Sequence, residues 1–226
     1  MPKPAPAFAG FDRDALQFLH ELSLEMNREW FEANKARYQA RWVTPLTALL
    51  DDVRARLAKT YAPIKLGPPK IFRIYRDTRF SKDKTPYKTH VAGMISLREG
   101  CAALYMHLGI GDEEFVGAGT YYFEPNQLPR WRKVVAADKT GKEIAAIVAK
   151  LRKRKFEVGG HEDYKKVPKG FAPDHPRAEF LKMRGLTAGP PSIPRGLIHK
   201  PAFADWLVEQ GKAMAPMTSW LYRNVK

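Results

Sequence analysis

Between residues 71 and 123, segments with the pattern of β-strands follow one another without a helical pattern between them. These segments are 71–76, 88–97, 103–110 and 114–123. Turn-forming residues separate them, at Lys84-Thr85-Pro86, Glu99-Gly100 and Gly111-Asp112. Parallel strands need crossover connections, usually through a helix, whereas antiparallel neighbours can be joined by short turns. The region therefore predicts an antiparallel sheet made of consecutive hairpins.

Helical patterns precede this strand region. Asp12 and Asn27 are expected to cap two helices, and Thr44 with Pro45 is expected to start a third. The third helix has an apolar face with a 3.6-residue period, formed by Leu46, Leu49, Leu50, Val53 and Leu57. A face of this kind predicts a helix packed against a core.

Helical patterns also follow the strands, with starts expected at Pro125 and near Thr140. Residues 156–194 are rich in Gly and Pro, and predict one strand near Phe156 and a short helix over 176–183. Two final helices are expected from their apolar residues, which are Phe203, Trp206 and Leu207, then Met214, Met217 and Leu221. The segregated order predicts an α+β fold, a mostly antiparallel sheet with the N-terminal and C-terminal helices packed mainly on one face.

The length of 226 residues fits a single domain, which we expect over residues 11–226. Residues 1–10, MPKPAPAFAG, predict a disordered Pro-rich tail and lack the apolar stretch of a signal peptide. Cys101 is the single cysteine, so a disulfide framework is excluded within the chain and a cytoplasmic protein is expected. No apolar run approaches the length of a membrane span, so no membrane partner is expected.

The net charge of +15 favours anionic partners. Six cations and two carboxylates lie in one stretch, FRIYRDTRFSKDKTPYKTH, at residues 72–90. In a strand, successive side chains point to opposite faces. One set, expected to face the core, is Phe72, Ile74, Arg76, Thr78 and Phe80. The other set, expected to form a polar face, is Arg73, Tyr75, Asp77 and Arg79.

The strand at 103–110 shows the same division. Leu104, Met106 and Leu108 form an apolar face, and Tyr105 and His107 point the other way. If helices cover the apolar face, the opposite face suits an anion with an aromatic or planar part. Arginine supplies paired donors for carboxylate or phosphate, and tyrosine supplies a stacking ring and a hydroxyl.

A purely structural interpretation of the same residues stays open. Arg76 beside Asp77, and Arg79 near Asp83, can form ion pairs that hold a turn in place. His107 can act as a general base near neutral pH, or it can be an ordinary residue of the sheet.

The spacing RxxRDxRF at 73–80, followed by KDKxxYK at 82–88, resembles the signature of domain-of-unknown-function family 2461. An early helix is also similar, through Asn27, Arg28, Trp30, Phe31, Lys35 and Tyr38. So are the positions Gly117, Gly119, Pro125, Leu128 and Arg132, and later Lys165, Pro168, Gly170, Phe171, His175, Pro176, Leu181 and Lys182. The resemblance implies that the hallmark residues share one role, and these are Arg73, Arg76, Asp77, Arg79, Lys84 and Tyr87. It implies no particular reaction or ligand.

Other candidate sites are weaker. His161, Glu162 and Asp163 are adjacent in a loop, where neighbouring side chains diverge, so no metal is expected. Neither a dinucleotide nor a phosphate-loop fingerprint occurs, so no cofactor is expected.

The segment 130–155 holds ten Lys or Arg residues and two acidic residues. Its basic helices suggest a nucleic-acid-binding module as an alternative function, although a solvated helix face explains the same charges. A further alternative is a structural or partner-binding protein whose cations meet an acidic surface.

Our leading expectation is a protein that binds a phosphorylated or carboxylated small molecule. The ligand-binding candidates are Arg73, Arg76, Arg79, Lys84, Tyr87 and Lys88. Arg73, Arg79 and Lys84 are expected to hold the anion. Asp77 and His107 are the candidates for a catalytic base, and whether the protein is an enzyme stays open, as does its oligomeric state.

Overall fold

The computed structural model describes residues 7–111 and 114–225. They include a six-stranded antiparallel sheet with the strand order β1-β2-β3-β4-β6-β5. The strands are β1 (Lys70–Ile71), β2 (His90–Ser96), β3 (Ala103–Gly109), β4 (Phe115–Thr120), β5 (Glu157–Gly159) and β6 (Leu186–Gly189). The predicted α+β fold is confirmed.

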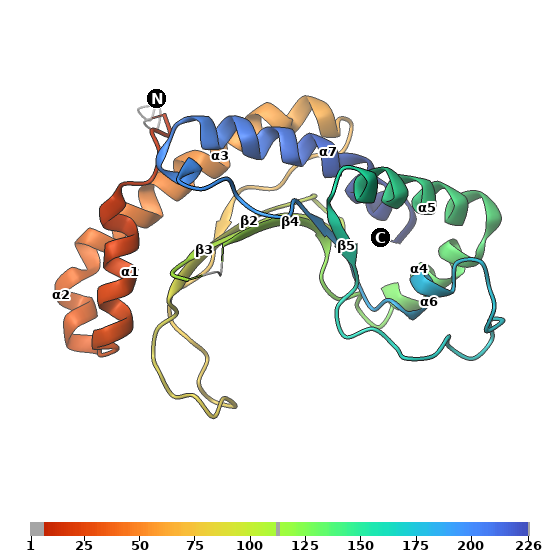
Figure 1. Cartoon of the computed structure of the whole chain (residues 1–226), viewed down its shortest axis with the longest axis horizontal. Coiled ribbons are helices and arrows are strands. Elements are labelled where there is room, and N and C mark those ends of the chain that lie inside the picture. Colours follow the sequence, from red (N-terminus) through yellow and green to blue (C-terminus); the bar gives the residue numbers. More distant parts are fainter. Residues whose placement is uncertain (1–6, 112–113, 226) are drawn as a thin grey trace.

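Helices surround this sheet on one side and at both ends (Figure 1). They are α1 (Arg13–Glu25), α2 (Arg28–Tyr38), α3 (Thr44–Tyr61), α4 (Gln127–Ala136), α5 (Asp138–Lys153), α6 (Ala178–Lys182) and α7 (Ala202–Val225). A π-helical turn, η1 (Gln39–Val43), and a 3-10 turn, η2 (Leu197–His199), complete the regular structure of the described residues.

The sheet is curved, and α3 and α7 lie over its convex side (Figure 1). A Cβ atom on Gly93 of β2 would lie 2.6 Å from Leu50 of α3, and a Cβ atom on Gly211 of α7 would lie 3.1 Å from Leu104 of β3. The main core therefore fills the space between these helices and the sheet. Among the described residues, no helix covers the concave side (Figure 1).

The first two helices begin where their caps predict. The Asp12 carboxylate accepts a hydrogen bond from the Asp14 N–H at 2.8 Å, and the Asn27 side-chain oxygen accepts one from the Trp30 N–H at 2.8 Å. These bonds satisfy donors that have no partner inside the helix.

The predicted break before the third helix is wrong. Thr44 has helical dihedral angles, and α2 continues through η1 into α3. A π-helical turn inserts one extra residue into a helix. Trp42 lies in this turn, fully buried, and its indole N–H donates to the Ala15 carbonyl at 2.7 Å. Burial of Trp42 against α1 thus accompanies a continuous helix where the sequence suggested a cap.

The two predicted final helices are one helix, α7, which runs through Pro216. Proline removes a hydrogen bond from a helix and disfavours its interior position. Residues on both sides of Pro216, including Met214, Met217 and Trp220, are fully buried. Continuous burial of this apolar face offsets the loss at the proline.

Two strands differ from the prediction. The predicted strand 71–76 is reduced to β1 and a single bridge between Tyr75 and Tyr87, and Phe80, expected in the core, is 94% exposed. The chain leaves β2 there because it pairs with its own returning part. By contrast, β6 lies in the segment expected to contain one strand near Phe156, and it separates β4 from β5. Its four residues are too few to show a period.

Residues 1–6 of the expected tail lie outside the described residues. Phe8 is buried, with its ring centroid 5.2 Å from that of Phe11 and 6.3 Å from that of Phe203. This aromatic ring therefore belongs to the core.

Gly119 allows β6 to approach β4. Its φ angle is +139°, and an added Cβ would lie 2.1 Å from the Leu186 carbonyl oxygen. Since that region of backbone space is nearly restricted to glycine, we expect Gly119→Ala to lower the free energy of unfolding by about 2 kcal/mol or more. Gly159→Ala is the control, because no atom lies within 4 Å of its added Cβ. Urea denaturation measures both, and equal stability of the two variants would contradict this role.

Candidate functional site

Residues 72–89, called the arm below, leave the sheet after β1 and return to β2 (Figure 1). The base of the arm is a short ladder, in which the Arg76 N–H donates to the Pro86 carbonyl at 2.9 Å and the Lys88 N–H donates to the Ile74 carbonyl at 2.8 Å. Tyr87 fixes this ladder to the fold.

Tyr87 is fully buried, and its ring stacks on Phe31 of α2 with centroids 4.6 Å apart. Tyr75, across the ladder, completes a group of three rings at 5.4 Å from Tyr87 and 5.6 Å from Phe31. Stacked and edge-on arrangements of this kind are favourable for aromatic side chains. The arm is thus anchored to α2 at its base.

Ion pairs order the outer part of the arm, with partners exchanged relative to those considered from the sequence. Arg76 pairs with Asp83 at 2.7 Å, and Arg79 pairs with Asp77 at 2.7 Å. The hydrogen bonds from Arg79 hold the pKa of Asp77 below its usual value. Lys84 donates to the Thr78 carbonyl at 2.8 Å. The tip therefore uses three of the predicted residues for local contacts.

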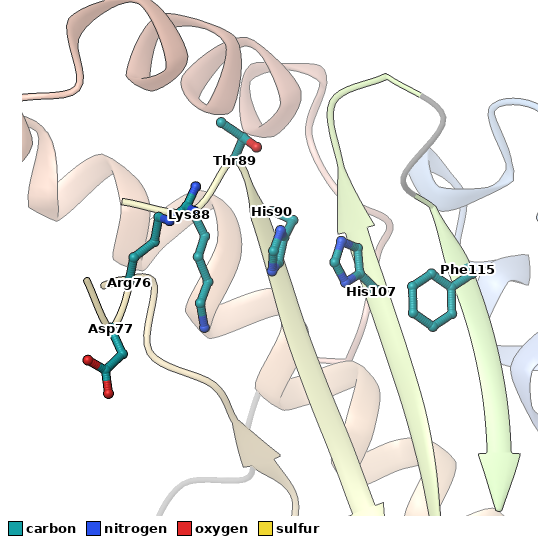
Figure 2. A pocket seen from close by; sticks show the side chains of 7 residues that line it. All are labelled: Arg76, Asp77, Lys88, Thr89, His90, His107 and Phe115. Atoms are coloured by element: carbon teal, nitrogen blue, oxygen red, sulfur yellow. The ribbon is translucent and has the colours of Figure 1, made fainter. Parts of the chain in front are cut away.

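An open hollow of about 570 Å³ lies between the arm and the edge of the concave sheet face. Figure 2 shows the side chains that line it, which are Arg76, Asp77, Lys88, Thr89, His90, His107 and Phe115. Arg76 and Lys88 come from the arm, whereas His90, His107 and Phe115 stand on β2, β3 and β4 (Figure 2). The floor of the hollow is therefore built from three neighbouring strands.

The three ring-bearing residues form a row across these strands (Figure 2). The His90 and His107 centroids are 3.8 Å apart, and those of His107 and Phe115 are 5.0 Å apart. Tyr105 continues the same face, with its hydroxyl 3.4 Å from Nδ1 of His107. The predicted division of this strand is confirmed, because Leu104, Met106 and Leu108 are buried on the other side.

Positive charge is concentrated at the arm side of the hollow. Burial lowers the pKa of Lys88, and the neighbouring Arg73 and Arg76 lower it further. Burial also lowers the pKa of His90 to about 4, with contributions from His107, Lys88 and Arg76. His90 is therefore neutral at pH 7, and a negative charge in the hollow would relieve the repulsion around Lys88.

The structure divides the residues proposed from the sequence. Arg76, Asp77, Lys88 and His107 line the hollow. The others lie outside its lining: Tyr87 in the core, Arg79 and Lys84 in contacts of the tip, and Arg73 on the exposed face of the arm.

Sequence reasoning missed His90, Thr89 and Phe115. His107 pairs directly with Phe115 across β3 and β4, and His90 pairs with Gly109 of β3. Alternation within β2 was the available signal for His90, but the register that joins these residues is a property of the folded sheet.

A family model with the description "Conserved hypothetical protein (DUF2461)" matches residues 14–220. The chain belongs to this family. The match confirms the resemblance seen in the sequence. No curated protein and no solved structure matches the chain.

The basic segment 130–155 of this DUF2461 protein forms most of α4 and α5. Trp131 is fully buried and stacks on Phe123 at 4.9 Å, so it lies inward as predicted. Arg152 pairs with Glu179, and the Arg132 guanidinium lies 5.2 Å from the centre of the Tyr164 ring. This region thus combines cations with one exposed aromatic ring.

Two searches of the described residues returned nothing. Residues 7–111 and 114–225 contain no group of three or more His, Cys, Asp and Glu side chains arranged to hold a metal ion. Within the same ranges, no helix has the length and apolarity needed to cross a membrane. His161, from the loop considered for metal binding, contacts the Tyr121 hydroxyl through Nε2.

The low pKa of His90 predicts a pH dependence. Between the ordinary pKa of 6.5 and the folded-state value of about 4, the unfolded chain binds more protons at this residue than the folded protein does. The contribution of neutral His90 to stability is therefore complete above pH 6.5 and is lost as the pH falls toward 4. We expect the His90 ring signals in NMR to titrate near pH 4, and His90→Asn to weaken the acid dependence of the melting temperature. Titration of His90 near pH 6.5 would contradict this environment.

Proposed function

We propose that this DUF2461 protein binds a phosphorylated or carboxylated small molecule in the hollow between the arm and the sheet. The observation that carries the proposal is the convergence of Arg76 and Lys88 on one open hollow with a neutral histidine, His90. The lowered pKa of Lys88 supports it, because crowded cations without a counter-charge favour the binding of an anion.

Arg76 is suited to this role even though it pairs with Asp83. The ion pair uses Nη1, and a guanidinium has five N–H donors in a planar fork. Asp83 also accepts hydrogen bonds from the Thr85 N–H and hydroxyl, at 2.9 and 2.8 Å, so its position is fixed by the arm itself. Arg76 is thereby held in place with donors remaining for a ligand.

If a reaction follows binding, His107 is the better candidate for a base. Asp77 is held in its charged form by two hydrogen bonds from the Arg79 guanidinium, at 3.0 and 2.7 Å. A carboxylate with so low a pKa is a weak base at neutral pH. The imidazole of His107 lies on the floor of the hollow, where it can reach a bound molecule.

The basic helices offer a second candidate function, nucleic-acid binding through residues 130–155. The specific observation in its favour is the stacking of Arg132 on the 44% exposed ring of Tyr164, since such pairs contribute to the binding of single strands. Affinity that falls steeply with salt would support this function. A docking surface for an acidic protein is a third proposal, supported by the net charge of +15. A cytoplasmic location, proposed from the single cysteine, suits all three.

Substitution of the hollow cations tests the leading proposal. Phosphate and citrate are the probes, followed by melting temperature and isothermal titration calorimetry. We expect the wild-type protein to be stabilised, and Lys88→Met and Arg76→Gln each to bind about tenfold or more weakly, because a charged hydrogen bond contributes ~1.5–3 kcal/mol.

Arg79→Gln is the matched control, since it removes a cation from the same arm outside the lining of the hollow. Its affinity is expected to equal that of the wild type. Absence of stabilisation by either anion would overturn the proposal. So would a loss in Arg79→Gln as large as that in Lys88→Met.

A further inference from the structure

The row of rings ends at Phe115, which is 50% exposed. We infer that the ligand of the hollow is a nucleotide, whose base stacks on Phe115 while its phosphate meets Arg76 and Lys88. This inference rests on the anion-binding function proposed above, and it adds the chemical class of the ligand. It is carried by the position of an exposed ring and of a cation pair in one hollow.

The rings are arranged as a stack that can be extended. The planes of His90 and His107 are inclined by 32°, and those of His107 and Phe115 by 20°. Tyr105 contacts Phe115 from the same face, with centroids 5.5 Å apart. A further planar ring placed against Phe115 would continue the offset stacking that aromatic groups prefer.

The neighbouring strand leaves room for this ring. The pairing of β4 with β6 covers residues 118–120 of β4, whereas Phe115 is the first residue of the strand. Phe115 therefore lies beyond the part of β4 that β6 accompanies. Its exposed half follows from this register, and it borders the hollow.

The remaining lining supplies groups for the edge of a base and for a sugar. A neutral imidazole has one donor and one acceptor nitrogen, and His90 is neutral at pH 7 because its pKa is about 4. Thr89 contributes a hydroxyl to the same lining. The volume of about 570 Å³ lies within the range of about 300–1,000 Å³ that is usual for small-molecule pockets.

The observations favour a mononucleotide over a nucleic-acid strand. Proteins that hold single strands present successive aromatic platforms along a basic groove. Here His90, His107 and Tyr105 are only partly exposed, and Phe115 is the most exposed ring of the row. One ring position beside one cation pair fits one nucleotide.

The test compares ligands that share a phosphate and differ in the ring. Isothermal titration calorimetry is performed with AMP, GMP, CMP, UMP and ribose 5-phosphate on the wild type, Phe115→Leu and Phe80→Leu. Phe80 is the matched control, because it is an exposed phenylalanine of the arm outside the lining of the hollow. We expect the best nucleotide to bind about tenfold or more tightly than ribose 5-phosphate in the wild type and in Phe80→Leu. In Phe115→Leu this advantage should vanish, with the affinity for ribose 5-phosphate unchanged.

The outcomes separate the inference from the proposed function. If ribose 5-phosphate and the nucleotides bind equally to the wild type, the inference is overturned and the anion site stands. If none of the ligands binds, both fail. A nucleotide advantage that survives in Phe115→Leu also overturns the stacking position, and an oligonucleotide that binds far more tightly than any mononucleotide overturns the choice of a single nucleotide.

Discussion

The stack of Tyr87 on Phe31 is the contact on which the proposed site depends. It joins the arm, whose tip is held only by its own ion pairs, to the long helical segment that packs on the core. Exposed ion pairs contribute about 0–1 kcal/mol each and are screened by salt, so they cannot fix the arm relative to the sheet. A buried aromatic pair adds ~0.5–1.5 kcal/mol beyond the burial of its area. Lys88 follows Tyr87 directly, so its place beside β2 is set by this anchor.

The other requirement is the uncovered concave face. Because α3 and α7 bury the convex side, every second side chain of β2, β3 and β4 points away from the main core (Figure 1). At one edge these positions carry His90, His107 and Phe115, and the register brings them into a row. The arm then adds cations beside aromatic rings. The hollow thus arises where a polar, self-paired segment meets an open sheet face.

Much of this arrangement could be predicted from local patterns. Asp12 and Asn27 cap helices through bonds to backbone groups only two or three residues away, and the alternation of 103–110 is a property of a single strand. Contacts between distant residues could not be predicted in this way. The pairing of Arg76 with Asp83, the burial of Trp42 against Ala15 and the place of β6 each depend on how remote segments meet. For the site, the sequence indicated Arg76, Lys88, Asp77 and His107, whereas Phe115 required the register of β3 with β4.

The most direct test of the central claim is to locate an anion in a crystal of the protein. Crystals soaked in tungstate, an electron-rich tetrahedral dianion, would reveal its positions by anomalous diffraction. The account predicts a tungstate peak in the hollow, within hydrogen-bonding distance of the Arg76 guanidinium and the Lys88 ammonium group. An empty hollow, with tungstate bound instead near Arg132 and Arg184 or near Arg54 and Arg98, would contradict it.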